Sequence, residues 1–298
     1  MTEMSSKPLL VIGKDSRIGR AVCEVAAVSG LRTIATGRRQ LAGEDQIFFD
    51  FLESSLDLLA PAAAMGRYAV VCAAFTDMNR CDSCPEAKRL NCDRMTELLD
   101  WFGERGVVPI FLSSNYIFDG SGQHRDDELP SPITAYGRQK AMVEAHLRET
   151  TYPSLVLRLS HVYGVKPDSG CYVEEIVDRI LSHQVQRGAV DQIFCPTFIG
   201  DVAEVIIRCA AQGVTGRFNI GTVEKLSRYD LACRLREALD SSSPEIVACS
   251  INDFGFPELR PRDTSFAPSS LVDTIGFRCR EFDDLLEAIV ENAAVARK

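Results

Sequence analysis

The feature that most constrains the fold is an alternation of short apolar segments with longer segments whose apolar residues recur at helical spacing. The first apolar run, Leu9 to Ile12, ends in Gly13, and residues 18–28 then repeat apolar positions every three to four residues. This alternation predicts strands joined by amphipathic helices, and therefore a parallel sheet covered on both faces. Further strands are predicted at 33–35, 46–49, 69–72, 108–112 and 155–159, and helices at 56–65 and 87–102.

After the sixth predicted strand the pattern loosens. Helices are predicted at 173–181, 201–211, 228–239 and 283–294, with a short extended piece at 192–194 and a loop with three prolines at 257–268. We therefore predict an α/β protein with a doubly wound, Rossmann-type parallel sheet at residues 7–165. A smaller, mixed substrate-binding lobe is predicted at residues 166–298. Whether segments near 190–225 return to the first domain is left open.

Composition and charge narrow the class of protein. The chain has 298 residues, of which 46% are hydrophobic and 25% charged, as expected of a globular protein with a sizeable core. Its net charge of -9 disfavours a nucleic-acid partner, because phosphate-backbone binding normally needs a basic face. With no apolar run near the roughly 20 residues of a membrane helix and no signal-peptide pattern, we expect a cytoplasmic protein without a membrane partner.

Eleven cysteines are scattered from Cys23 to Cys279, and their odd number predicts reduced, mostly buried thiols rather than a disulfide framework. Cys81, Cys84 and Cys92 come nearest to the spacing of a zinc site. A fourth ligand at suitable spacing is missing from the sequence nearby, so no metal is predicted.

The turn after the first strand has the spacing of a dinucleotide-binding loop. Gly13 can supply a tight turn, Gly19 permits close packing of the helix on the strand, and the helix N-terminus suits a pyrophosphate. Ser16 takes the place of the middle glycine, so the backbone can approach a phosphate less freely there. A strand, turn and helix that bind no nucleotide remain an alternative for this loop alone.

The end of the second predicted strand favours one cofactor. An NAD site usually places Asp or Glu about 20 residues after the glycine turn to hold the ribose hydroxyls. Here Gly37 is followed by Arg38 and Arg39. Because guanidinium groups suit a 2′-phosphate, the predicted cofactor is NADP, used as NADPH.

Tyr136 and Lys140 are the predicted catalytic pair, since residues four apart share one face of a helix. A nearby cation favours the ionised phenol, so we expect the pKa of Tyr136 to fall from about 10 toward neutrality. Tyr136 could then give a proton to a carbonyl oxygen. Upstream, the fifth strand ends at the sheet edge where ligands of doubly wound folds bind. There Ser114 is the candidate to hold the substrate carbonyl, with Ser113 as the alternative.

Taken together, these motifs resemble the extended short-chain dehydrogenase/reductase family. The resemblance rests on the glycine turn, Cys72-Ala73-Ala74, Asn91, Ser114, and Tyr136 with Lys140. Further segments are similar to the dTDP-4-dehydrorhamnose reductases and their relatives, which include the regulatory beta subunit of methionine adenosyltransferase. These segments are 113–120, 135–137, 158–164, 195–197 and 260–262.

The resemblance implies additional site residues. The cofactor-binding residues would be Gly13, Ser16, Arg17, Ile18 and Gly19 at the pyrophosphate, Asp50 and Phe51 at the adenine, Ala73 and Ala74 at the ribose, Asn91, and Lys140 at the nicotinamide ribose. The substrate-binding residues would be Asn115, His161, Thr197 and Arg260. Arg260 would contact the diphosphate of a sugar nucleotide. For His161, a structural imidazole is favoured over an acid or base.

The function that the resemblance implies is NADPH-dependent reduction of a nucleotide-linked 4-keto-6-deoxysugar, with the proton from Tyr136. An epimerase or dehydratase is one alternative, although Asn115 and Tyr116 stand where dehydratases carry an Asp-Glu pair. A non-catalytic, NADP-binding regulatory subunit is the other, and the departures from the family pattern at Ser16, Cys72 and Asn115 leave it open. A homodimer or a partner enzyme is left open as well.

Overall fold

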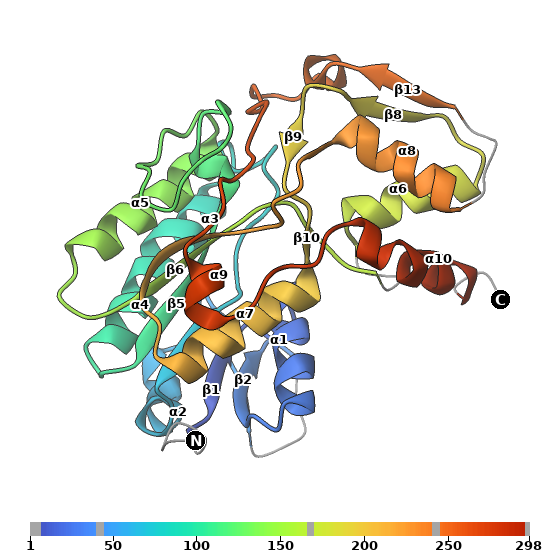
Figure 1. Ribbon diagram of the computed structural model, residues 1–298. Helices are drawn as coiled ribbons and strands as arrows, with labels where there is room; N and C mark the ends of the chain where they lie inside the picture. The colour runs from blue at the N-terminus through green and yellow to red at the C-terminus, as the bar shows by residue number, and fades with distance from the viewer. Residues whose placement is uncertain (1–6, 40–44, 166–169, 240–244, 296–298) are drawn as a thin grey trace.

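The computed structural model describes residues 7–39, 45–165, 170–239 and 245–295, and its centre is a seven-stranded parallel sheet (Figure 1). The strand order is β3–β2–β1–β4–β5–β6–β11, so the chain reverses its direction of winding between β1 and β4. The fold class predicted from the alternating pattern is confirmed. The strands are β1 (Leu9–Ile12), β2 (Thr33–Gly37), β3 (Gln46–Phe48), β4 (Tyr68–Val71), β5 (Val108–Ser114), β6 (Leu155–Leu159) and β11 (Gly216–Ile220).

Helices cover both faces of this sheet because its strands are apolar on both sides. Leu9 and Val11 of β1 belong to one core, and Leu10 and Ile12 to the other. The first core is completed by α1 (Arg17–Val28), α7 (Ile199–Gln212) and α9 (Leu271–Ile275). The second is completed by α2 (Ala60–Met65), α4 (Met95–Gly103) and α5 (Ala135–Glu149).

The predicted helix at 87–102 is wrong in one respect, because it is not a single regular helix. It consists of α3 (Pro85–Lys88), a π-helical stretch at Arg89–Arg94, and α4. The wider turn coincides with Asn91, whose amide is fully buried and hydrogen-bonded to the neighbouring loop. A π-helical turn inside an α-helix frequently marks a functional site.

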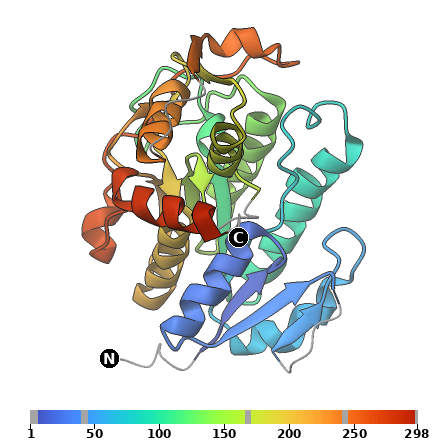
Figure 2. The same ribbon diagram turned by 90° about the vertical axis from the view of Figure 1, so that its right-hand side faces the viewer.

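The C-terminal lobe lies above the sheet in both ribbon views (Figures 1 and 2). Its own core includes Tyr163, Ile176, Phe194, Leu231 and Phe282. Three two-stranded ladders link its segments, and their pairs are β10–β7, β12–β9 and β13–β8. The remaining elements are β7 (Val162–Tyr163), α6 (Tyr172–Leu181), β8 (Gln186–Ala189), β9 (Ile193–Phe194), β10 (Thr197–Phe198), β12 (Leu226–Ser227), α8 (Arg228–Ala238), β13 (Ile246–Cys249) and α10 (Leu286–Val295).

Two elements from the second half of the chain complete the N-terminal domain. Strand β11 pairs in parallel with β6, from Gly216 opposite Leu155 to Ile220 opposite Leu159. Helix α7 packs directly against α1. The chain thus enters the lobe after β6, returns to the sheet for α7 and β11, and then re-enters the lobe.

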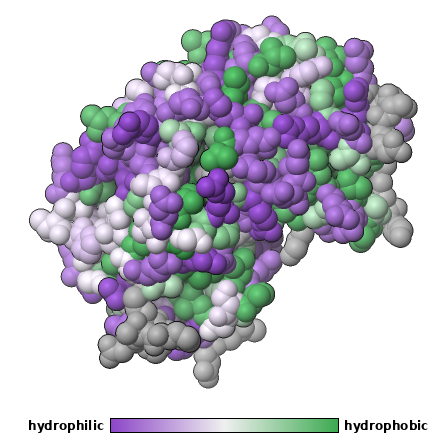
Figure 3. All heavy atoms as spheres, viewed as in Figure 1, coloured by the Kyte–Doolittle hydropathy of each residue, from purple (hydrophilic) through white to green (hydrophobic). Residues whose placement is uncertain are grey.

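The outer surface in the view of Figure 3 is mainly hydrophilic, with hydrophobic residues in small patches. None of the helices in the described segments has the length and apolar character needed to cross a bilayer. All eleven cysteines fall within those segments as free thiols, and seven of them are buried.

Candidate active site

A cleft of about 500 Å³ lies at the carboxyl ends of β1, β2 and β4, at the reversal in winding where doubly wound folds bind ligands. Nine of the predicted cofactor residues line it: Gly13, Ser16, Arg17, Ile18, Arg38, Asp50, Phe51, Ala73 and Ala74. The sequence prediction missed other lining residues, among them Asp15, Arg20, Thr36, Thr76 and Ile199. Asp15 lies within the glycine turn and Thr36 just before Gly37, so the motifs already marked their neighbourhood, whereas Thr76 and Ile199 reach the cleft only through the fold.

The glycine turn has the geometry that its residues predict. Gly13 has a φ of +88°, which favours glycine, and its N–H donates to Thr36 Oγ1 at 3.0 Å. A Cβ on Gly19 would lie 2.4 Å from the Gly13 carbonyl oxygen, so only glycine lets α1 start this close to the strand. Ser16 is the N-cap of α1 and accepts a hydrogen bond from Gly19 N at 3.0 Å. One of the helix N–H groups available to a phosphate is therefore already satisfied.

The turn after β2 carries Arg38 at the rim of this cleft. The Asp15 carboxylate accepts the Arg38 backbone N–H at 2.8 Å, and so fixes this turn against the glycine loop. A Cβ on Gly37 would lie 2.9 Å from that carboxylate, which explains the glycine here. The side chains of Arg38 and Arg39 are exposed, and only Arg38 lines the cleft. The cleft lining does not include the other four predicted cofactor residues, which are Gly19, Arg39, Asn91 and Lys140.

The three predicted catalytic residues meet at the carboxyl end of β5. The Ser114 hydroxyl lies beside the Tyr136 phenol, where it partly opposes the effect of burial on the phenol pKa, and it accepts from Tyr116 N at 3.2 Å. Lys140 lies 5.8 Å from the Tyr136 ring centroid, and its Nζ donates to the Leu112 carbonyl oxygen at 2.8 Å. Ser113 donates to the buried Glu144 carboxylate at 2.5 Å, so the structure favours Ser114 over this alternative.

Burial, rather than the neighbouring cation, dominates the protonation of this pair. Burial raises the pKa of Tyr136 above its ordinary value, with only partial compensation from the Ser114 hydrogen bond. The expected fall in the pKa of Tyr136 is therefore wrong for this structure, because burial outweighs the influences that would lower this pKa. Burial also lowers the pKa of Lys140 to about 8.

Helix α5 starts at a site that several segments hold in place. Thr134 is its N-cap and accepts from Gly137 N at 3.1 Å. A Cβ on Gly137 would lie 2.0 Å from the Tyr116 carbonyl oxygen, so glycine allows α5 to touch the turn after β5. Glu258 of the lobe accepts from Ala135 N at 3.0 Å, which places a carboxylate at the positive end of α5.

Asn91 does not line the cleft and instead contacts α5 at Gln139, between Tyr136 and Lys140. Its Nδ2 donates to Gln139 Oε1 at 2.7 Å and to the Phe75 carbonyl oxygen at 2.9 Å, and its Oδ1 accepts from Phe75 N at 2.8 Å. Gln139 Nε2 donates onward to the Cys81 carbonyl oxygen at 3.0 Å. These contacts join the loop after β4 to α5 between Tyr136 and Lys140.

The four predicted substrate residues are placed differently. Asn115 is buried and donates to Thr264 Oγ1 at 2.7 Å, and Thr197 is fully buried with its hydroxyl donating to the Cys195 carbonyl oxygen at 3.1 Å. The hydrogen bonds of both side chains thus go to protein groups. His161 stacks on the Phe194 ring at 4.0 Å, and burial lowers its pKa to about 3, so the imidazole is neutral.

Arg260 is also buried, and its Nη2 donates to Asn79 Oδ1. Its Nη1 has no hydrogen-bond partner among the residues that the structure describes. Among the predicted substrate residues, Arg260 is therefore the one whose guanidinium can still donate a hydrogen bond to a ligand.

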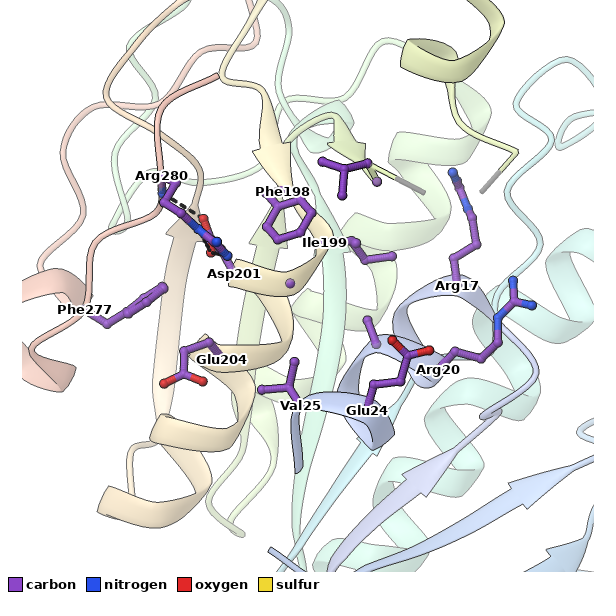
Figure 4. A pocket seen from close by; sticks show the side chains of 14 residues that line it. Arg17, Arg20, Glu24, Val25, Phe198, Ile199, Asp201, Glu204, Phe277 and Arg280 are labelled. Carbon is purple, nitrogen blue, oxygen red and sulfur yellow. Dashed lines mark hydrogen bonds and ion pairs between the residues drawn. The ribbon is translucent and has the colours of Figure 1, made fainter. Parts of the chain in front are cut away.

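A second cavity, of about 580 Å³, adjoins the cleft at Arg17, Arg20 and Ile199 (Figure 4). On its far side Arg280 pairs with Asp201 at 2.5 Å. Its lining combines three arginines with three carboxylates, so it has no single charge that would select a ligand. Within the described segments, no group of three or more His, Cys, Asp or Glu side chains is arranged to hold a metal ion.

The fold and the Ser-Tyr-Lys arrangement define a Rossmann-type protein of the extended short-chain dehydrogenase/reductase class. The family model described as the RmlD substrate binding domain matches residues 7–295, and the chain belongs to this family. The resemblance predicted from the sequence motifs is thereby confirmed.

Similar proteins include both enzymes and a subunit. The chain is 28% identical to the probable low-salt glycan biosynthesis reductase Agl14 of Haloferax volcanii, over 73% of this chain and 75% of that one. It is 26% identical to the methionine adenosyltransferase 2 subunit beta of Mus musculus, over 81% and 75%. Among solved structures, the dTDP-4-dehydrorhamnose reductase of Bacillus anthracis in complex with NADP matches with a TM-score of 0.83 and 17% identity, over 95% and 98% of the two chains.

Proposed function

We propose that this chain is an NADPH-dependent reductase of a nucleotide-linked sugar, and specifically of a 4-keto-6-deoxysugar. The observation that carries the proposal is that Ser114 and Tyr136 place their hydroxyls together at the sheet edge, with Lys140 on the same helix. Support also comes from the names of similar proteins, which include a probable glycan biosynthesis reductase and a dTDP-4-dehydrorhamnose reductase.

The lining of the cleft fits a dinucleotide phosphate. Gly13 and the start of α1 would approach the pyrophosphate, with Arg17 beside it, and Arg38 would bind a 2′-phosphate at the rim. Ala73 and Ala74 leave room for a ribose because their side chains are small. When bound, the cofactor supplies a hydride to the carbonyl carbon of the substrate.

The protein groups supply orientation and the proton. The Ser114 hydroxyl would hold the ketone oxygen, and Tyr136 would donate its proton to that oxygen as the ketone becomes a secondary alcohol. The raised pKa of Tyr136 keeps its phenol protonated, which suits a proton donor. Lys140, with its pKa lowered to about 8, is still mostly protonated at neutral pH and would bind the ribose hydroxyls.

The test is NADPH oxidation with dTDP-, UDP-, GDP- and CDP-linked 4-ketosugars, with NADH in parallel. We expect turnover with at least one of them, and a fall of about 10²- to 10⁴-fold in kcat for Tyr136→Phe with NADPH binding retained. Full turnover by Tyr136→Phe on a true substrate would refute the mechanism. NADPH binding without oxidation, together with co-purification of a partner protein, would support a regulatory subunit instead.

A further inference from the structure

Four buried polar atoms near Tyr116 have no hydrogen-bond partner within the described part of the chain. They are Tyr172 Oη, Gln192 Oε1, Arg228 Nε and Arg260 Nη1. Buried polar groups in native proteins are nearly always paired, so a cluster of unpaired ones calls for a partner outside the chain. Their sequence positions span almost 90 residues, and only the folding of the lobe brings them together.

Ring contacts connect the catalytic tyrosine to this cluster. Tyr136 packs edge-on against Tyr116 at 6.5 Å, Tyr116 lies 5.9 Å from His161, and His161 lies 5.7 Å from Tyr172. The Arg228 guanidinium then lies 5.7 Å from the centroid of the Tyr172 ring. We name Tyr116, His161, Tyr172, Gln192, Arg228 and Arg260 the Tyr116 cluster, since the charge of Arg260 also acts on Tyr116.

Gln192 fixes the two sides of the cluster relative to each other. Its Nε2 donates to the Tyr116 hydroxyl at 3.2 Å, and its backbone carbonyl accepts from Arg228 N at 3.2 Å. Arg228 is the first residue of α8, directly after the N-cap Ser227, so a hydrogen-bonded helix start sets its position. The guanidinium therefore extends from a rigid part of the lobe.

The cluster is positively charged. Burial raises the pKa of Tyr116 and of Tyr172, and the positive charges oppose it, from Arg228 and Arg260 at Tyr116 and from Arg228 at Tyr172. Burial lowers the pKa of His161, and Arg228 lowers it further. Arg228 has no ion pair in the described residues, and the carboxylate nearest to Arg260, that of Glu258, is 3.9 Å away. Two guanidinium groups with so little negative charge close to them favour an anionic ligand.

We propose that Arg228 is a second anion-binding residue of the substrate site, acting together with Arg260. The inference rests on the proposed function, because it assumes that the ligand is a sugar nucleotide held next to Tyr136. Two parts of such a substrate could supply the negative charge, namely the diphosphate or a carboxylate on the sugar. Gln192 Oε1 and the Tyr172 hydroxyl would complete their hydrogen bonding with the same molecule.

The experiment measures binding by calorimetry with the full chain saturated with NADP. The probes are UDP, UDP-glucose and UDP-glucuronic acid, and the variants are Arg228→Met, Arg228→Lys and Arg260→Met. Arg236→Met, two turns further along α8, is the matched control. Thermal unfolding of each variant checks that the fold is retained.

If Arg228 binds the diphosphate, Arg228→Met lowers the binding affinity for all three probes about 10- to 100-fold, as expected for the loss of a hydrogen bond to a charged group. If it binds a sugar carboxylate, only UDP-glucuronic acid is weakened. Arg228→Lys keeps the charge and should lose less affinity, and Arg236→Met should stay within twofold of the wild type. Unchanged binding of every probe by folded Arg228→Met, or no binding of any probe by the wild type, would overturn the inference.

The two proposals can fail separately. Turnover of a ketosugar with an unchanged KM in Arg228→Met would refute the role of Arg228 and leave the reductase intact. Arg228-dependent binding of UDP without NADPH oxidation on any ketosugar would refute the reductase and leave the anion site intact.

Discussion

Replacing Lys140 by methionine is expected to stabilise the folded chain while it removes the activity. Lys140 is 2% exposed, and burial lowers its pKa from the ordinary 10.5 to about 8. A change of this size corresponds to about 3 kcal/mol of unfavourable free energy when the group is charged in both folded and unfolded chains. Loss of the hydrogen bond to Leu112 O costs about 1 kcal/mol, which leaves a net gain of about 2 kcal/mol at pH 7.

The sign of this effect depends on pH. Below about pH 8 the lysine is protonated in both states, so the folded wild type bears the whole penalty. Between about pH 8 and 10.5 the folded chain loses the proton first, and the wild type becomes more stable relative to the variant. Near pH 10.5 the advantage of the variant should be gone.

Urea unfolding at pH 7 and pH 10, followed by the fluorescence of the single tryptophan, Trp101, measures this difference. Lys88→Met is the matched control, because Lys88 is exposed and should give the same small difference at both pH values. A Lys140→Met variant that is less stable than the wild type at pH 7, or whose difference from it is the same at both pH values, would show that the buried ammonium does not destabilise the folded chain.

Three further predictions concern other parts of the molecule. Arg158→Met removes the fully buried arginine that pairs with Glu144 and leaves Arg217 at 3.3 Å, so it should lower the free energy of unfolding by about 3 kcal/mol. Arg208→Met in a more exposed pair should cost less than about 1 kcal/mol, and equal costs in urea unfolding would contradict this difference. Replacing Arg38 and Arg39 by serine should raise the KM for NADPH relative to NADH by about 10- to 100-fold, and steady-state kinetics with an unchanged ratio would count against NADP selectivity. Gly137→Ala places a methyl group 2.0 Å from the Tyr116 carbonyl oxygen and should lower the free energy of unfolding by about 1–3 kcal/mol. Unaltered thermal unfolding would show that the turn after β5 can move away from the helix at no cost.

Most of the sheet could be predicted because its inner strands are largely apolar, and β6 has Arg158 as its single polar residue. Strand β6 has the predicted bounds, Leu155–Leu159, and both faces of it are buried. Strand β11 was missed, since Arg217 and Asn219 interrupt its apolar character. These polar residues are tolerated there because Arg217 lies 3.3 Å from the Glu144 carboxylate and Asn219 donates to the His124 carbonyl oxygen at 2.9 Å. Such partners lie far away in the sequence and cannot be read from local pattern.

The site shows the same division between local and distant information. The glycine turn and the pairing of Tyr136 with Lys140 depend on residues a few positions apart, so spacing alone could predict them. Whether a side chain points into the site is a property of the packed structure, and no local pattern indicates that the Thr197 hydroxyl donates to the Cys195 carbonyl oxygen. Arg228 lies more than 100 residues from Tyr116, and no motif marks it. The rise in the pKa of Tyr136 could not be predicted from the sequence either, because helical spacing reveals a neighbouring cation but not the extent of burial.

The return of the chain to the sheet at β11 has a consequence for biosynthesis. During translation, β6 would be an open sheet edge until the chain has been extended to Ile220, because its partner strand has not yet been made. The sheet and the lobe must therefore mature together, and residues 7–165 produced alone are expected to expose this edge and to self-associate. Ribosome pausing or truncation before Ile220 would leave the nascent protein most exposed to aggregation, and most dependent on chaperones.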